Sequence, residues 1–167
     1  MRPVETKHFG TLPCDDGSVF DFPQGLPAFE EEKSFVLIEA PETAPLVFLQ
    51  SMARAGLCFA ALPILAADET YQLAVAPEDL AALGLESGRQ PALGREVTVL
   101  ALVSLHDELL ATANLMAPVV LNVKLRRGLQ AIRRDARYSH QYPVVPHPAK
   151  TNAAWPPEAV CPPEDLC

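Results

Sequence analysis

Residues 97–105 read Val-Thr-Val-Leu-Ala-Leu-Val-Ser-Leu and are almost wholly apolar. Valine and leucine dominate the run, and β-branched residues favour extended backbone. A strand with one solvated face would alternate apolar with polar residues, which this run does not do. The run therefore predicts a central β-strand that is buried on both faces.

Runs of strand length recur on either side of this segment, separated by proline, glycine and acidic residues. The spacing predicts an all-β fold, an antiparallel barrel-like domain or a sandwich. Residues 119–132 are predicted to form a hairpin, with Arg126-Arg127-Gly128 as its turn. The other runs are 4–9, 18–22, 34–39, 46–51, 57–62, 70–75, 118–124 and 129–134.

One short helix is predicted from Pro77 to Gly84. Proline suits the first helical position, and Glu78 and Asp79 favour the positive end of the helix dipole. From residue 143 onward the chain carries 7 of its 17 prolines. Such a composition buries too little surface to offset the entropy of ordering. We expect one β domain over residues 1–143 and a loose, Pro-rich extension with Trp155 over residues 144–167.

Composition and charge exclude several classes of protein. The mean hydropathy is +0.12 and no long apolar run is present, so neither a membrane span nor a secretion signal is predicted. We therefore expect a cytoplasmic location. The net charge is −8. Residues 1–123 carry −11 and residues 124–137 carry +5. An acidic body with one basic segment favours basic partners and disfavours direct nucleic-acid binding.

Catalytic and metal-binding hypotheses find little support in the sequence. His106 and Asp107 follow the central strand, where we expect a turn, and could act with Ser51 or Ser104 in a small cytosolic hydrolase. No Gly-x-Ser-x-Gly elbow accompanies them, so no enzyme is expected. No phosphate-binding loop or cofactor motif is present. A metal site built from His140, His147, Cys161 and Cys167 would use plausible ligand types, but their spacing is loose and disfavours it.

Residues 22–30 read Phe-Pro-Gln-Gly-Leu-Pro-Ala-Phe-Glu and predict a stiff surface turn. The two prolines fix φ and force the residues before them into extended backbone, while Gly25 tolerates a positive φ. Two interpretations stay open at this point. Phe22 and Phe29 can simply pin the loop, or the loop can be a pre-organised docking edge. Glu30, Glu31 and Glu32 are expected to lie in water.

Residues 112–122 read Thr-Ala-Asn-Leu-Met-Ala-Pro-Val-Val-Leu-Asn. Pro118 cannot donate to a ladder, so it predicts a strand start or an edge. A buried, unpaired asparagine costs about 1–3 kcal/mol, so Asn114 and Asn122 must bond to backbone or to a partner. They either tie loops together or flank an exposed edge on which Met116 is an adaptable contact.

These two stretches resemble the flagellar assembly factor family, FliW. Residues 5–10 (Glu-Thr-Lys-His-Phe-Gly) resemble the family's opening strand, and residues 48–51 (Phe-Leu-Gln-Ser) a strand after the first loop. Residues 138–143 stand where the family's core ends. The resemblance spans residues 3–143. It departs from the family at Ala28, where glycine is usual.

The resemblance implies a β-fold protein that binds two other proteins in turn and is a monomer when free. One is flagellin, held as a chaperone would hold it. The other is CsrA, a translational regulator whose repression of flagellin mRNA is relieved by allosteric antagonism. A flagellin-only chaperone is the alternative within this class. The residues that we expect to meet partners are Phe22, Pro23, Gly25, Leu26, Phe29, Glu30, Gln50, Asn114, Met116, Pro118 and Asn122.

Overall fold

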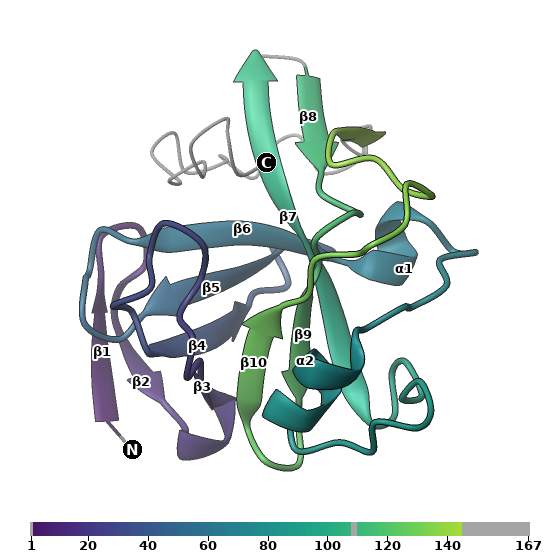
Figure 1. The fold of residues 1–167 in the computed structure, drawn as a ribbon. Coiled ribbons are helices and arrows are strands. Elements are labelled where there is room, and N and C mark those ends of the chain that lie inside the picture. Colours follow the sequence, from purple (N-terminus) through teal and green to yellow (C-terminus); the bar gives the residue numbers. More distant parts are fainter. Residues whose placement is uncertain (1, 108–109, 145–167) are drawn as a thin grey trace.

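The computed structural model describes residues 2–107 and 110–144, and most of the regular secondary structure in them consists of short strands (Figure 1). Its helices are α1 (Ile64–Ala67), α2 (Pro77–Ala82) and the single 3₁₀ turn η1 (Asp16–Ser18). Its strands are β1 (Arg2–Thr6), β2 (Gly10–Cys14), β3 (Val19–Asp21), β4 (Ser34–Glu39), β5 (Val47–Ser51), β6 (Cys58–Pro63), β7 (Val97–Asp107), β8 (Leu110–Ala113), β9 (Val119–Asn122), β10 (Arg127–Gln130) and β11 (Tyr142–Val144).

Seven of these strands close a barrel. Their order is β7-β6-β5-β4-β3-β10-β9, and β9 pairs back onto β7. Six of the seven contacts are antiparallel, whereas β3 and β10 run parallel and share one residue pair, Asp21 with Arg127. The predicted antiparallel, barrel-like all-β fold is confirmed, and of the two architectures left open the barrel is the one found.

The predicted central strand is β7, and it organises the fold. Its first part pairs with β9, residues Leu100–Leu102 pair with β6, and its last part leaves the barrel and pairs with β8. β11 adds to the far side of β8. Val97, Val99 and Leu100 are each almost completely buried, which confirms the expected burial on both faces.

Alternate residues of the barrel strands enter two separate cores. One core fills the barrel and contains Phe20, Phe22, Phe35, Phe59 and Leu121. The other covers the outer face of β6, β7 and β9 with side chains from α1, α2 and the loop between them. Because both faces of these strands are covered, their sequences show only partial alternation.

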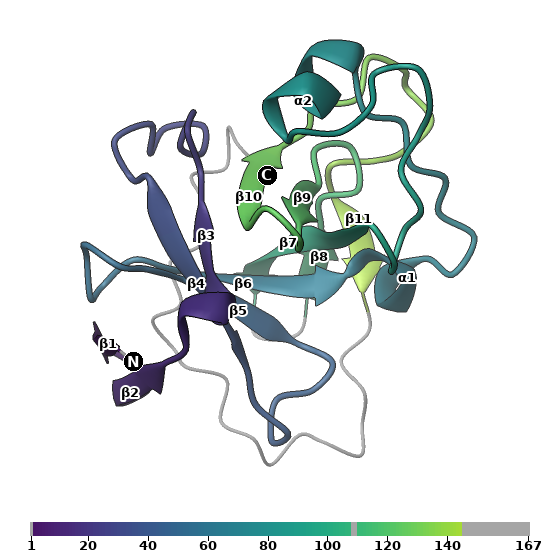
Figure 2. The ribbon, with the colours of Figure 1, turned by 90° about the horizontal axis from the view of Figure 1, so that it is seen from below.

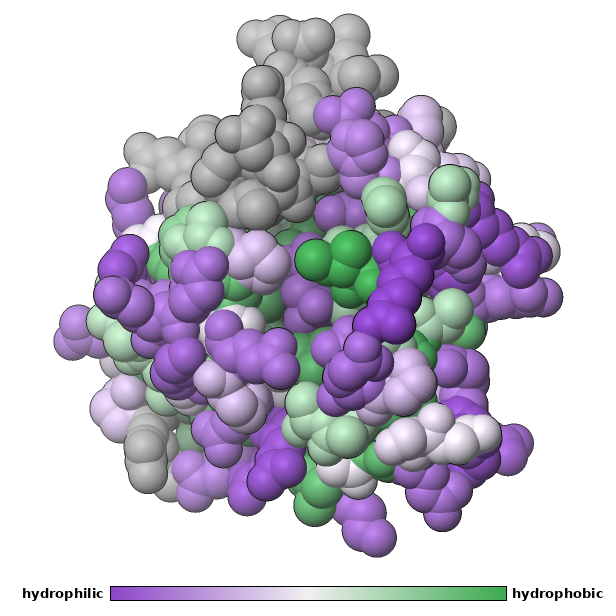
Figure 3. Space-filling view, in the orientation of Figure 1, coloured by the Kyte–Doolittle hydropathy of each residue, from purple (hydrophilic) through white to green (hydrophobic). Residues whose placement is uncertain are grey.

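Two elements cover the outside of the barrel on different sides (Figures 1 and 2). The predicted helix is α2, and its Leu80 is buried in the outer core. The β1–β2 hairpin lies over β4, with Val4, Cys14 and Val36 forming a small cluster. Figure 3 shows that hydrophilic residues dominate the face seen in Figure 1 and that apolar residues reach it in separate patches.

Several local expectations were wrong. Residues 70–75 form no strand, because Tyr71 and Val75 enter the outer core from a loop. The β9–β10 hairpin turns at residues 123–126, so Arg127 and Gly128 lie in β10 rather than in the turn. β7 continues through residues 106–107, where we expected a turn. The predicted extension beyond residue 144 lies outside the described residues, within which no helix is long and apolar enough to cross a membrane.

Phe22 anchors the barrel core from the start of the loop after β3. Its ring is fully buried and meets Phe35 edge-on at a centroid distance of 5.1 Å. Gly128 faces the same ring, since a Cβ at that position would lie 2.5 Å from the Phe22 Cζ. The ring therefore pins the loop to β10 as well as to β4.

We expect Phe22→Ala to lower the free energy of unfolding by about 3–5 kcal/mol, because a buried ring is replaced by a cavity. Phe29→Ala should cost less, since Phe29 is only half-buried against Phe59. Urea unfolding of both variants measures the difference. A cost near zero for Phe22→Ala would show that the ring does not anchor the barrel.

Candidate partner-binding site

The loop of residues 22–33 is braced across its own width. The Gly25 amide donates to the Phe22 carbonyl at 2.8 Å, and the Phe29 amide donates to the Leu26 carbonyl at 2.7 Å. At the base, the Phe22 amide donates to the Lys33 carbonyl at 2.8 Å. These bonds hold residues 22–33 in a turn, as the sequence predicts.

Glu32 fixes the loop to the neighbouring β5–β6 turn. It was expected in water, but it is buried and accepts a hydrogen bond from the Ser51 hydroxyl at 2.6 Å. Its other oxygen pairs with Arg54 Nε at 2.6 Å. Ser51 Oγ in turn accepts from the Arg54 amide at 3.0 Å. A buried carboxylate is tolerated here because each of its oxygens has a partner.

Gln50 supports the same turn from β5. Its side chain is fully buried, and Nε2 donates to the carbonyls of Ser51, Arg54 and Ala55 at 2.9–3.2 Å. The Gln50 Oε1 atom is buried without a hydrogen-bond partner. Gln50 was expected to meet a partner, but the structure places it beneath the surface as a brace.

The two asparagines are braces as well. Asn114 Oδ1 accepts from the amides of Met116 and Ala117 at 3.1 and 2.9 Å. Asn122 Nδ2 donates to the Leu83 carbonyl at 2.8 Å, just past α2, and its Oδ1 accepts from the Lys124 amide at 3.1 Å. Of the two interpretations of these asparagines, the one in which they tie loops together agrees with these bonds.

The predicted site residues therefore divide by depth. Met116 and Phe29 are half-buried, and Pro118 is buried directly before β9, as expected for a strand start. The exposed members are Pro23 and Glu30. Those inside the protein are Phe22, Gly25, Leu26, Gln50, Asn114, Pro118 and Asn122.

The exposed side of the loop forms a groove with α2 and the end of β10, which we call the loop groove. Its volume is about 310 Å³. Ile132, which the sequence reasoning did not single out, is 57% exposed here. Partial burial, and then the neighbouring Glu78 carboxylate, raises the pKa of Asp79. The residues that line the groove include Gln24, Pro27, Glu30, Asp79, Gln130 and Ile132.

The predicted basic segment is not a uniform solvated face, because Arg133 is buried. Its guanidinium pairs with Asp135 at 2.8 Å, donates to the Gln72 carbonyl at 2.7 Å and lies 4.7 Å from the Tyr138 ring centroid. The hydrogen bond from Arg133 lowers the pKa of Asp135. Burial raises the pKa of Tyr71, whose hydroxyl accepts from Arg133 at 3.2 Å.

Three other cations of this segment also have partners. Arg134 pairs with Glu78, Arg137 donates to Gln72 Oε1 at 2.6 Å, and Arg126 donates to the Asp16 carbonyl at 2.6 Å. The positive charges are thus dispersed over several elements.

The described residues bring no metal-binding set together. They contain no group of three or more His, Cys, Asp or Glu that could hold a metal, and His140 is exposed. Burial raises the pKa of the Cys58 thiol to about 12, so it is not a nucleophile near neutral pH. His106 and Asp107 end β7, and their side chains lie outside the described part. His147, Cys161 and Cys167 also lie outside it.

Comparison with known proteins agrees with this picture. The family model described as FliW protein matches residues 3–144. The chain belongs to the FliW family. Flagellar assembly factor FliW of Leptospira biflexa is 36% identical over 143 residues, which are 85% of this chain and 90% of that protein. The corresponding factor of Heliobacterium modesticaldum is 30% identical over 150 residues, 90% of this chain and 95% of that protein.

The fold is shared with a FliW protein of known structure. A crystal structure titled as that of the flagellar assembly factor FliW superimposes with a TM-score of 0.74 at 28% identity. The alignment covers 87% of this chain and 98% of that one. The barrel is therefore the fold of a FliW protein.

Two residues in the loop of residues 22–33 have a left-handed backbone conformation. Gly25 has φ +65°, and a Cβ there would lie 2.6 Å from the Glu30 Cα atom. Ala28 has φ +68°, a conformation that costs a non-glycine residue about 1–2 kcal/mol. Ala28, which stands where the family usually has glycine, is thus a position at which glycine would relieve backbone strain.

Substitutions at these two positions should change stability in opposite directions. Gly25→Ala should lower the free energy of unfolding by about 2–4 kcal/mol, from the backbone strain and the clash together. Ala28→Gly should raise it by up to about 1 kcal/mol, since relief of strain exceeds the entropy that glycine loses on folding. Thermal and urea unfolding measure both, and a destabilised Ala28→Gly would contradict the strain at Ala28.

Arg133 and Arg134 form a matched pair for testing the buried cation. The Arg133 side chain is 3% exposed and that of Arg134 is 72% exposed. Arg133→Met should cost at least about 2 kcal/mol, because it leaves the Gln72 carbonyl and the Tyr71 hydroxyl without their donor. Arg134→Met should stay within about 0.5 kcal/mol. Equal losses in urea unfolding would show that Arg133 does not hold these segments together.

Proposed function

We propose that this FliW-family protein is a flagellar assembly factor that works by binding two other proteins in turn. In the cytoplasm it holds flagellin as a chaperone. When secretion removes flagellin, it binds the translational regulator CsrA and relieves the repression of flagellin mRNA. The observation that carries the proposal is the family match over residues 3–144.

The construction of the loop supports a binding role. Its backbone is pre-organised by its own hydrogen bonds and by the Glu32 brace, so ordering it on binding would cost little entropy. The loop groove offers Ile132 as an apolar contact beside the polar Gln24 and Glu30. Such a mixed surface is typical of a non-obligate protein interface.

The charge distribution supports CsrA as the second binding partner. A body of charge −11 over residues 1–123 repels nucleic acid but attracts a basic RNA-binding protein. The protein can thus control an mRNA without touching it. We propose that it does so allosterically, by binding CsrA more tightly in a state with weak RNA affinity.

The mechanism is tested by titrating the purified protein against a preformed complex of CsrA and labelled RNA. Allosteric antagonism predicts that RNA dissociates faster as the protein concentration rises. Simple competition predicts an unchanged dissociation rate.

Recovery of CsrA from a flagellin-free lysate tests the flagellin-only alternative, which predicts that none is recovered.

Ile132→Asp tests the loop groove as a partner surface. We expect it to weaken binding of flagellin or CsrA at least tenfold, because it places a charge at an apolar contact. Leu65→Asp on α1 is the matched control, since Leu65 is exposed to a similar degree (45%) away from the groove. Equal affinities of the two variants would remove the loop groove from the proposal.

A further inference from the structure

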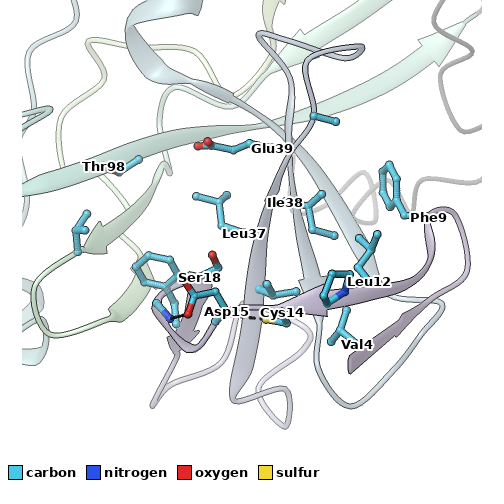
Figure 4. A pocket seen from close by; sticks show the side chains of 16 residues that line it. Val4, Phe9, Leu12, Cys14, Asp15, Ser18, Leu37, Ile38, Glu39 and Thr98 are labelled. Atoms are coloured by element: carbon cyan, nitrogen blue, oxygen red, sulfur yellow. Dashed lines mark hydrogen bonds between the residues drawn. The ribbon is translucent and has the colours of Figure 1, made fainter. Parts of the chain in front are cut away.

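A second and larger groove lies along β4 and shares no lining residue with the loop groove. Its volume is about 700 Å³. Figure 4 shows Leu37 and Ile38 on opposite sides of β4, with Thr98 beyond Leu37 and with Leu12 and Phe9 beyond Ile38. The groove therefore contains a strand edge with an apolar recess on each side. We call it the β4 groove.

The direction of the β4 peptide groups follows from one hydrogen bond. The Met52 amide donates to the Ser34 carbonyl at 3.0 Å, so Ser34 directs its peptide groups toward β5. Successive residues of a strand alternate in this respect. Ile38 therefore faces β5, whereas Leu37 and Glu39 face the side on which β3 lies.

β3 is too short to cover that side. Its pairing with β4 ends at Val19 with Val36, while β5 pairs with β4 as far as Glu39. The Ser18 amide, which could extend the ladder, donates instead to the Asp15 carbonyl at 2.9 Å. The Leu37 carbonyl and the Glu39 amide therefore border the β4 groove, and no strand of the described residues runs beside them.

The recesses on the two sides suit alternate side chains of an added strand. One recess is the open end of the barrel, where Phe20, Leu37 and Val123 line the groove. The other lies under the β1–β2 hairpin, where Leu12 and Ile38 line it. A peptide hydrogen-bonded to β4 would direct one apolar side chain into each recess.

The charges around the groove indicate the sign of its occupant. Asp15 and Glu39 line it and are exposed, and Asp16 is exposed beside them. Residues 1–50 as a whole contain nine Asp or Glu and three Lys or Arg. A segment that carries a lysine or arginine next to its apolar residues would be attracted here.

We infer that the β4 groove binds an extended, basic and apolar peptide segment of a protein partner by strand addition to β4. Main-chain hydrogen bonds to Leu37 and Glu39 provide affinity, and the two recesses select apolar side chains at alternate positions. The inference rests on the proposed function, because the partner is one of the two proteins that the chain is proposed to bind.

Amide exchange of the full chain, followed by NMR with and without saturating flagellin or CsrA, tests strand addition directly. One of the two proteins should slow exchange of the Glu39 amide at least tenfold. The Ile38 amide is an internal control, because it already faces β5 and should change less than twofold. Binding of both proteins with unchanged Glu39 exchange would overturn the inference and leave the proposed function intact.

Two pairs of variants give an independent measurement. Val123 and Leu125 are both 49% exposed in the β9–β10 turn, and only Val123 lines the groove. Val123→Asp should weaken the same partner at least tenfold, and Leu125→Asp less than twofold. Glu39→Lys should weaken it three- to tenfold, more at low salt, whereas Glu42→Lys should not. Equal effects within each pair would overturn the inference.

Two further outcomes would also contradict it. If neither flagellin nor CsrA binds the unaltered protein, the proposed function fails, and this inference fails with it. If Glu39 exchange is already slow in the free full chain and becomes fast when residues 145–167 are deleted, the occupant is the chain's own C-terminal segment. In that case the assignment to a partner is wrong.

Discussion

The burial of β7 on both faces is the constraint on which the rest of the structure depends. This one strand pairs with β9 and β6 to close the barrel and then continues outward to pair with β8. Its residues alternate between the core inside the barrel and the core beneath α1 and α2. A polar substitution on either face would place an unpaired group in an apolar core, and the positions from Val99 to Val103 are accordingly all apolar.

Closure of the barrel leaves one weak place in its wall. β3 has three residues and β4 has six, so the wall is incomplete where η1 ends and β3 begins. The seam between β3 and β10 is also short, with a single residue pair. The weak seam and the open edge of β4 have the same cause, which is the brevity of β3. The β4 groove follows from this mismatch in strand length.

Buried polar side chains, rather than the loops' own composition, decide the shape of the surface. Glu32 holds the loop after β3 against the β5–β6 turn, Gln50 braces that turn, and Asn114 and Asn122 hold two further turns. Several residues that the sequence and the family resemblance indicated as partner contacts are these braces. Their hydrogen bonds hold the turns and loops that they support in place, whereas Glu30 is exposed.

The sequence by itself determined the elements whose signals are local. The apolar run at residues 97–105 acts through β-propensity and the burial of its side chains. The proline that begins α2 and the two prolines around Gly25 constrain the backbone of their neighbours, and the structure contains all three features. Only the tertiary structure decided which polar residues are buried. Glu32 and Arg133 look like solvated charges in the sequence, yet each is buried by partners 19–62 residues away. The groove along β4 was equally hidden, because an open edge depends on where a neighbouring strand stops, and no periodicity within β4 records that.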